Sequence, residues 1–435
     1  MAYDIIIGRD NSDKEKFGNK GLIFLGKGYV KMGNYSSLSN NLWMDVARSH
    51  IILVAGKRGS GKSYSLGVIA EELSNLPQEN AKNIASLIFD TMGIFWTMKY
   101  KNEKDAQLLN EWKLETHSLP VKVFVPFGKS EEYKNKGIPF DHTFALKVSE
   151  LESEDWVTLF NLELTSPAGV LIENTLTDMK SRNLNYTIQD IKKKVKEASS
   201  SDQTKEIVSS LFNAADSWGV FSKFAEGVEV SDLLIPGTTS VLDISVYSST
   251  SAFNVRALVI SLISKKIFSK RMDARKKEEL DSLQHGQDYL SYKSYLSDPL
   301  VWIFIDEAHE FLPKEGKTPA SDALIQLLRE GRQPGISLVL ATQQPGQIHR
   351  DVMSQSDIVL SHRVTSKADL EALNEIMQSY MLSGIKKQMD DLPSSKGSAI
   401  ILDDNSERIY PARIRPRFTW HGGEAPTSVK ADIKL

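Results

Sequence analysis

The chain has 435 residues, of which 41% are hydrophobic and 25% are charged, as in an ordinary soluble globular protein. Its 53 lysines and arginines are balanced by 56 acidic residues. There is no overall basic excess, so a nucleic-acid site would have to be a local patch or a property of an assembly. The absence of cysteine excludes disulfides, thiolate metal sites and a cysteine nucleophile.

The sequence shows no targeting or membrane signal. The N-terminus lacks a basic segment followed by a long apolar stretch, and no apolar run approaches the roughly 18 residues of a transmembrane helix. We therefore expect a cytoplasmic protein that does not enter a membrane.

Short β-like runs occupy residues 1–48. Residues 22–25 and 29–32 are apolar in character and are separated by Gly26 and Gly28, which are typical of turns. We expect a small β-rich N-terminal module there.

From residue 49 onward, near-continuous apolar runs alternate with helical patterns. The runs cover residues 51–55, 87–89, 121–125, 241–244, 301–305, 336–340, 358–360 and 399–402. Such runs are typical of strands buried on both faces of a mainly parallel sheet, so we predict an α/β fold.

Two stretches break this alternation. Helical patterns fill residues 146–235 and predict a helical insertion, while a Ser/Tyr/Gln-rich stretch near 273–298 predicts a mobile loop. We therefore divide the chain into five parts. These are the module (1–48), the first part of the core (49–145), the insertion (146–235), the second part of the core (236–405) and a C-terminal tail (406–435).

A phosphate-binding loop follows the first core strand. It consists of Gly56, Lys57, Arg58, Gly59, Ser60, Gly61, Lys62 and Ser63, which fit the pattern G-x-x-x-x-G-K-[ST]. Glycines let backbone N–H groups converge on phosphate oxygens at a helix N-terminus. We expect Lys62 to reach the β- and γ-phosphates, Ser63 to be a ligand of Mg²⁺, and Tyr64 to lie beside the nucleotide.

Two acids end the apolar run 301–305. Asp306 and Glu307 would lie at the carboxyl edge of the sheet, where α/β proteins bind ligands. Asp306 is the candidate carboxylate for Mg²⁺, and Glu307 is the candidate general base for the attacking water. A strand ending in a solvated turn would give the same pattern, but the phosphate loop favours the catalytic interpretation.

Two further polar residues follow core strands. Gln343 comes after the run 336–340 and could contact the γ-phosphate or position water, or it could be an ordinary loop residue. Asp90 comes after the run 87–89. It could assist water or metal, although capping of the next helix is an equally good interpretation.

Two arginines lie near the end of a predicted helix. Thr318 and Pro319 fit its start, and Gly331 fits the position after its last turn. Arg329 and Arg332 could simply complement the helix dipole. Alternatively, one of them acts across a subunit boundary on a neighbour's γ-phosphate.

Together these motifs resemble the HerA/FtsK group of RecA-like motor ATPases, and the HerA family more closely. The blocks that carry the resemblance are Gly56 to Ser63, Phe89-Asp90-Thr91-Met92-Gly93, Ile303 to His309, Arg329-Glu330-Gly331-Arg332, Ala341 to Pro345 and Arg413-Ile414-Arg415-Pro416-Arg417. The likeness spans roughly residues 50–420. The Asp-Glu-Ala-His block followed by the Arg-Glu-Gly-Arg and Ala-Thr-Gln blocks is its most specific part.

The resemblance implies a homo-oligomer, a hexameric ring with RecA-like cores that threads double-stranded DNA through its centre using ATP and Mg²⁺. It also implies an N-terminal β-barrel where a NurA-type nuclease docks, although only about 50 residues are present for it here. The inserted helices match the family's helical bundle. The tail arginines Arg413, Arg415 and Arg417 match a brace that would reach a neighbour's nucleotide, unless they form a solvated basic tail.

These observations predict a HerA-type double-stranded DNA translocase that works with a nuclease in DNA end processing. One alternative is an ATPase ring that scaffolds and activates an effector, a nuclease or another protein, in an anti-phage defence complex. A protein-secretion or conjugation ATPase is related in core sequence, but such proteins usually carry a membrane anchor.

Overall fold

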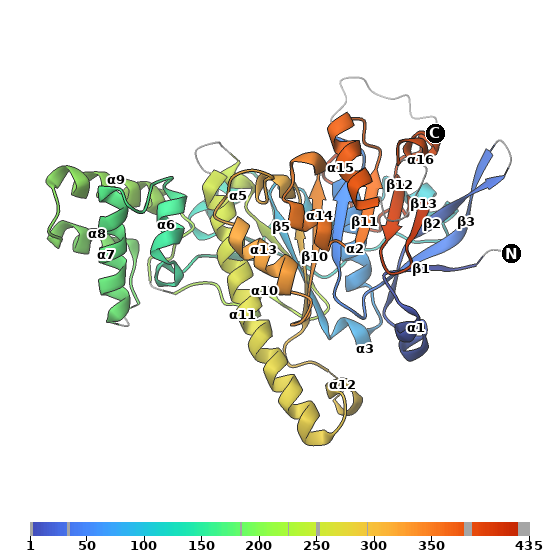
Figure 1. Cartoon of the computed structure of the whole chain (residues 1–435), viewed down its shortest axis with the longest axis horizontal. Helices are drawn as coiled ribbons and strands as arrows, with labels where there is room; N and C mark the ends of the chain where they lie inside the picture. The colour runs from blue at the N-terminus through green and yellow to red at the C-terminus, as the bar shows by residue number, and fades with distance from the viewer. Residues whose placement is uncertain are drawn as a thin grey trace.

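Thirteen strands form one continuous sheet in the computed structural model (Figure 1), which describes residues 3–32, 35–182, 185–224, 226–248, 253–293, 295–377 and 385–424. The strands are β1 (Ile5–Ile7), β2 (Leu22–Met32), β3 (Tyr35–Asp45), β4 (Ile51–Ala55), β5 (Ile84–Asp90), β6 (Val121–Pro126), β7 (His142–Phe144), β8 (Thr239–Asp243), β9 (Leu300–Ile305), β10 (Ile336–Thr342), β11 (Ile358–His362), β12 (Ser398–Asp403) and β13 (Arg408–Ile414). Their order is β1-β3-β2-β13-β12-β11-β4-β10-β9-β5-β8-β6-β7.

Helices flank this sheet and extend beyond it. They are α1 (Asn11–Phe17), α2 (Lys62–Ser74), α3 (Gln78–Ala81), α4 (Ala106–Glu111), α5 (Ser130–Asn135), α6 (Ser153–Leu159), α7 (Pro167–Ser181), α8 (Ile188–Glu197), α9 (Asp202–Ser217), α10 (Val230–Leu233), α11 (Phe253–His285), α12 (Tyr289–Tyr292), α13 (Ser321–Glu330), α14 (Arg350–Gln355), α15 (Lys367–Met377) and α16 (Ile385–Asp391).

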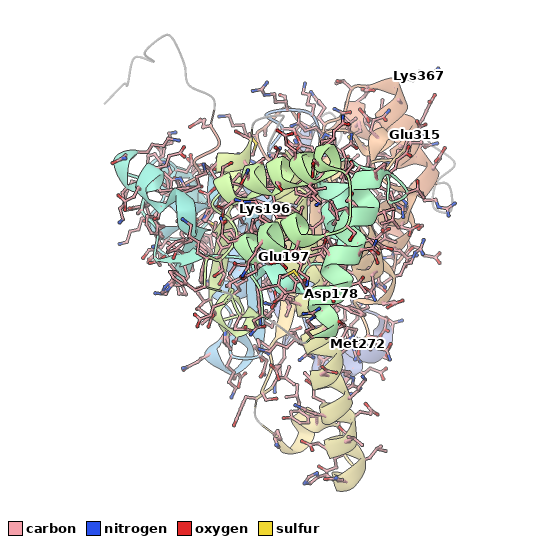
Figure 2. The ribbon with its side chains drawn as sticks, turned by 90° about the vertical axis from the view of Figure 1, so that its left-hand side faces the viewer. Asp178, Lys196, Glu197, Met272, Glu315 and Lys367 are labelled. Carbon is pink, nitrogen blue, oxygen red and sulfur yellow. The ribbon has the colours of Figure 1, made fainter. Side chains whose placement is uncertain are left out.

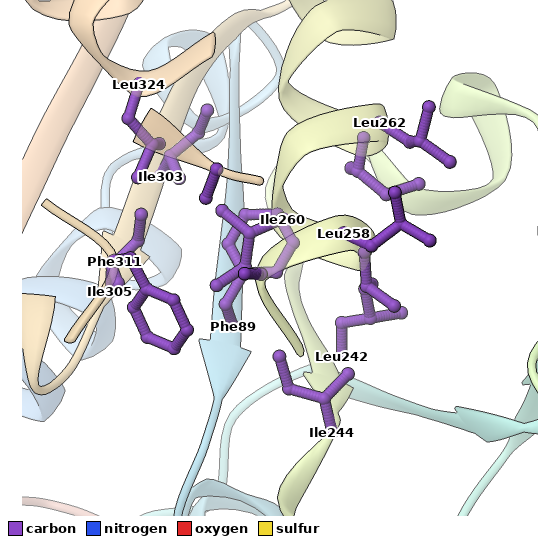
Figure 3. Close-up of a cluster of buried hydrophobic side chains, with 14 of the residues drawn as sticks. Phe89, Leu242, Ile244, Leu258, Ile260, Leu262, Ile303, Ile305, Phe311 and Leu324 are labelled. Atoms are coloured by element: carbon purple, nitrogen blue, oxygen red, sulfur yellow. The ribbon is translucent and has the colours of Figure 1, made fainter. Parts of the chain in front are cut away.

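The strands from β11 to β7 in this order run parallel, which confirms the predicted α/β fold. Their apolar runs are buried on both faces. In β4, Ile51 and Leu53 enter one core, whereas Ile52 and Val54 enter the other. Figure 3 shows part of the first core, where side chains of β5, β8 and β9 pack against α11 and α13. Because loops follow the carboxyl ends of parallel strands, this arrangement brings the predicted motifs to one edge.

The predicted helical insertion contains α6 to α10, of which α6 to α9 form the lobe at the left of Figure 1. Figure 2 views the molecule from this lobe, with Asp178, Lys196 and Glu197 in front. Trp156 anchors it, with its ring 4.9 Å from that of Phe212. These residues belong to the same core cluster as β4 and β9, so the lobe is packed continuously with the sheet.

The N-terminal strands extend the main sheet. Residues 22–32 form a single strand, β2, which pairs with β3 and with β13. Gly26 lies within the strand and allows a close approach, since a Cβ on it would lie 2.1 Å from the carbonyl oxygen of Arg413. The sheet has two edges, β1 and β7, so these described strands do not close into a barrel.

The predicted loop at 273–298 is wrong over its first half, because α11 continues as a helix to His285. Arg271 is buried there and donates to the carbonyl oxygens of Pro334 and Asp298 at 2.8 and 2.7 Å. On the exposed face, Arg275 and Glu279 form an i,i+4 pair. Helix-favouring pairs and this anchor therefore outweigh the loop-like composition.

A buried ion-pair chain links the N-terminal strands to the core. Arg9 pairs with Asp45, whose other oxygen lies 3.1 Å from Nε2 of His50. Nδ1 of His50 lies 2.7 Å from Asp357, and Asp357 pairs at 3.2 Å with Arg332. The two flanking carboxylates raise the pKa of the fully buried His50 to about 9, against the opposing effect of desolvation. The imidazole is therefore charged at neutral pH.

Because His50 is charged, we predict that the folded protein loses stability in mild alkali. Because the folded-state pKa of His50 lies above its unfolded value, the folded state binds the proton more tightly. The resulting stabilisation is complete below pH 6.5 and is lost as pH rises to about 9. The shift corresponds to about 3 kcal/mol.

Urea unfolding of the wild type and His50→Gln, each at pH 6.5 and 9, measures this effect. The wild type should lose more free energy of unfolding over this interval than the variant does. The comparison separates His50 from the buried Asp90, whose pKa near 8 also falls in the interval. Equal losses in the two proteins would show that His50 carries no such charge.

Candidate active site

The phosphate loop lies between β4 and α2, as the sequence predicts. Gly61 has φ +112°, which side chains rarely adopt, and a Cβ on Gly56 would lie 2.4 Å from Oγ of Ser60. That hydroxyl is buried and has no hydrogen-bond partner among the described residues. Lys57, Arg58 and Gly59 are exposed at the tip. The backbone conformation of the loop thus requires glycine at positions 56 and 61. The Ser60 hydroxyl is available to a ligand held in the loop.

Ser63 and Asp306 meet at the end of the loop. The Ser63 hydroxyl, in the first turn of α2, donates to Oδ2 of Asp306, which follows β9. These are two hard oxygen donors in direct contact, and they fit the ligand preference of Mg²⁺. A metal ion here would replace their mutual hydrogen bond.

Glu307 and Gln343 also meet at this edge. Nε2 of Gln343, just after β10, donates to Oε1 of Glu307. The other oxygen of Glu307 is buried without a hydrogen-bond partner among the described residues and lies 3.7 Å from Nδ1 of His309. The residue has φ +52°, a strained backbone for a glutamate. The arrangement leaves one carboxylate oxygen available for a water molecule.

Burial tunes the charged groups of the site. Desolvation raises the pKa of Glu307, and the neighbouring Asp306 raises it further. Desolvation lowers the pKa of Lys62, although both acids oppose this change. The Lys62 ammonium lies 3.4 Å from the carbonyl oxygen of Lys57, beneath the loop. A lysine among carboxylates and free N–H groups is suited to a phosphate chain.

Sequence reasoning missed a histidine behind the loop. His362 ends β11, is fully buried and has its pKa lowered to about 4 by desolvation, so the ring is neutral. Its Nδ1 lies 3.0 Å from the carbonyl oxygen of Ser398, and its Nε2 lies 2.9 Å from Oγ of Ser65. It thereby ties the start of α2 to β12. A polar residue closing an apolar strand was the only signal in the sequence.

Asp90 acts here as a cap, so its predicted catalytic role has no support from its contacts. Its oxygens accept the backbone N–H groups of Met92, Gly93 and Phe95 at 2.7 to 3.2 Å. The side chain is completely buried, and desolvation and Asp243 on the neighbouring strand raise its pKa to about 8. The capping alternative therefore describes the structure.

Arg329 and Arg332 flank the end of α13. This helix begins at Ser321 and not at Pro319, and the Thr318 hydroxyl donates to the carbonyl oxygen of Phe311 at 2.8 Å. Arg329 pairs with Asp351 at 2.6 Å, and its side chain is about half exposed. Arg332 is also about half exposed and donates to the carbonyl oxygen of Gln355 at 2.9 Å. Neither contacts the phosphate loop of its own chain.

In the C-terminal strap (residues 415–424), the arginines do not have the expected position beside a neighbour's nucleotide. Arg415 and Arg417 are fully buried and pair with Glu71 of α2, each at 3.0 Å. The backbone N–H of Arg417 donates to the hydroxyl of Tyr64, so Tyr64 also serves the strap. Because burial requires a partner for each guanidinium, these arginines brace their own helix instead of reaching a nucleotide. Arg413 is half-buried beside Trp112, and its Nε donates to the carbonyl oxygen of Lys396 at 3.2 Å.

Comparisons with known proteins identify the family of this chain. A family model described as the central domain of helicase HerA matches residues 35–267, more than half of the chain. The chain belongs to the HerA family. A second model, for zonular occludens toxin (Zot), matches residues 252–368. As a member of the HerA family, the chain is a P-loop NTPase.

The curated HerA relatives are distant and longer. The DNA double-strand break repair helicase HerA of Sulfurisphaera tokodaii is 21% identical over 378 residues, which cover 84% of this chain and 64% of the relative. HerA of Sulfolobus acidocaldarius is 20% identical over 387 residues, covering 86% and 67%. HerA of Pyrococcus furiosus is 26% identical over 194 residues, covering 41% and 33%. The chain thus spans between one third and two thirds of these HerA proteins.

A solved structure shares the fold. VirB4 of Thermoanaerobacter pseudethanolicus superimposes with a TM-score of 0.55 at 14% identity, covering 91% of this chain and 96% of that one. Within the part of the chain that the structure describes, no helix has the length and apolar character needed to cross a bilayer.

Proposed function

We propose that this protein is an ATPase that couples hydrolysis to movement along double-stranded DNA as a ring of identical subunits, most simply six. The observation that carries the proposal is the convergence of four polar side chains beside the glycine-lined phosphate loop. Lys62 and Ser63 begin α2 after the loop that follows β4, and Asp306 and Glu307 follow β9. The parallel strands β4 and β9 are separated only by β10. This is the set of groups that phosphoryl transfer to water requires.

Each residue has a defined task in this mechanism. The loop N–H groups and Lys62 bind and orient the phosphate chain. Ser63 and Asp306 would hold Mg²⁺, which supplies positive charge beside the β- and γ-phosphates when bound. Glu307 accepts a proton from the attacking water through its free oxygen, and its raised pKa suits that role. Gln343 orients Glu307 and contacts the γ-phosphate.

The proposal that hydrolysis drives movement along DNA rests on the relatives of this chain. The relatives named above are called DNA double-strand break repair helicases. Arg329 or Arg332 would complete the neighbouring subunit's site, since both lie on the surface away from their own loop. We further propose a nuclease partner of the NurA kind, or another effector, in the cytoplasm.

Steady-state ATPase activity with and without linear double-stranded DNA tests this proposal, with the mass measured in parallel by light scattering. We expect several-fold stimulation by DNA in a species near six subunits. A ring without any DNA response would contradict translocation and favour the effector-scaffold alternative. A monomer under all nucleotide conditions would contradict the action of an arginine in trans.

A further inference from the structure

Arg332 lies at the edge of the sheet opposite its own nucleotide site. It precedes β10 and contacts Asp357, which precedes β11, so both lie at the amino ends of these strands. The phosphate loop follows the carboxyl end of β4, a strand of five residues that pairs with both. Five residues span about 17 Å, which is longer than an arginine side chain. Arg332 therefore cannot complete the site of its own subunit.

The contacts of Arg332 fix one side of its guanidinium and leave the rest open. Nη2 bonds to Gln355 and pairs with Asp357, while 46% of the side chain remains exposed. Asp357 is itself nearly buried. Its Oδ1 accepts the backbone N–H of Ile51 at 2.8 Å, and its Oδ2 faces His50. The anchor of Arg332 is thus a rigid, charged group within the core.

The anchor continues into the N-terminal strands. Asp45, at the end of β3, is buried and lies between His50 and the Arg9 guanidinium. Arg9 is held in turn by the carbonyl oxygens of Gly18 and Lys20, at 2.6 and 2.7 Å. The charges alternate in sign along this series of ion pairs from Arg9 to Arg332. Removing one charge therefore changes the electrostatic forces on its neighbours.

We propose that Asp357 and Asp45 are positioning residues for Arg332. Through His50, they hold this arginine in the orientation that completes the active site of the next copy of the chain. Through Asp45, the N-terminal strands thereby contribute to the active site of a neighbouring subunit. This inference rests on the proposed function, because it requires an oligomer in which Arg332 acts in trans.

Coexpressed pairs of variants test the inference. An Arg332→Ala subunit keeps its own site but supplies no arginine, and a Glu307→Gln subunit supplies the arginine but has no working site. Each alone should be nearly inactive, and mixed rings should recover turnover. Adding Asp45→Asn to the Glu307→Gln subunit should lower this recovery roughly three- to thirtyfold without changing KM. Adding it to the Arg332→Ala subunit should change nothing.

This asymmetry separates positioning from general stability, since a folding defect would act in either subunit. Asp357→Asn should behave as Asp45→Asn does, and thermal melting checks that both variants fold. Arg48→Ala is the matched control, because the Arg48 side chain pairs with Asp13 at 2.8 Å in the same module. The backbone N–H of residue 48, which donates to Oδ2 of Asp45 at 3.0 Å, is retained in alanine. This variant should leave recovery unchanged.

Four results would overturn the inference. Equal losses from Asp45→Asn in either subunit would show a structural effect only, with the trans role of Arg332 intact. Full recovery with Asp45→Asn or Asp357→Asn in the arginine-donating subunit would show that Arg332 needs no such anchor. Wild-type turnover of Arg332→Ala alone, or no recovery in mixed rings, would remove the trans role of Arg332 and the inference with it.

Discussion

Glu307→Gln should reduce ATP turnover by at least about 100-fold while leaving ATP affinity nearly unchanged. A positioned general base contributes about 10²- to 10⁴-fold to a rate, and an amide cannot accept the proton from water. The groups that bind phosphate, Lys62 and Ser63, are untouched by the change. Phosphate release and equilibrium binding of a fluorescent ATP analogue measure the two quantities separately.

Glu310→Gln is the matched control, because Glu310 lies in the same turn and pairs with Arg256 at 3.3 Å. It should keep turnover close to the wild-type value. Comparable losses in the two variants would indicate a disturbed turn instead of a missing base. Undiminished turnover in Glu307→Gln would assign water activation to another residue.

Glu71→Ala should cause the largest loss of stability of any single change considered. The carboxylate is fully buried, and two guanidinium groups, the N–H groups of Phe418 and Thr419, and the Thr419 hydroxyl all donate to it. Removing one partner of a buried ion pair costs about 3 to 5 kcal/mol, because the remaining charge stays buried without compensation. That is a large fraction of a typical domain's total stability.

Urea unfolding measures this loss, and limited proteolysis shows whether the C-terminal strap detaches first. Glu71→Gln keeps the shape and should lose less than Glu71→Ala. Glu79→Ala, an exposed glutamate on α3, is the control and should remain within about 0.5 kcal/mol of the wild type. Wild-type stability of Glu71→Ala would mean that the strap does not brace α2.

The parts of the site that sequence could predict are those written in short, contiguous patterns. The spacing of Gly56, Gly61 and Lys62 specifies a loop by backbone geometry, and Asp306 follows a run of apolar residues that is typical of a buried strand. The parallel sheet then brings the ends of these strands together without further information. For the same reason, the α/β fold was predictable from the apolar runs.

The remaining contacts depend on partners far away in the chain. Glu71 meets Arg415 across 344 positions, and His50 meets Asp357 across 307, so neither pattern is visible locally. In the sequence, the arginines of a solvated basic tail cannot be distinguished from arginines that pair with a buried acid. Only the fold shows that Glu71 lies opposite them. Likewise, Gly26 resembles a turn residue until β13 is known to pass close beside it.

The position of β13 has a consequence for the nascent chain on the ribosome. It lies between β2 and β12, so the N-terminal hairpin joins the main sheet through a strand that is synthesised long after β2. At about 5–20 residues per second, the free edge of β2 waits tens of seconds for this partner. During that interval the edge can pair with other chains, so this protein should depend on chaperones until translation reaches residue 414.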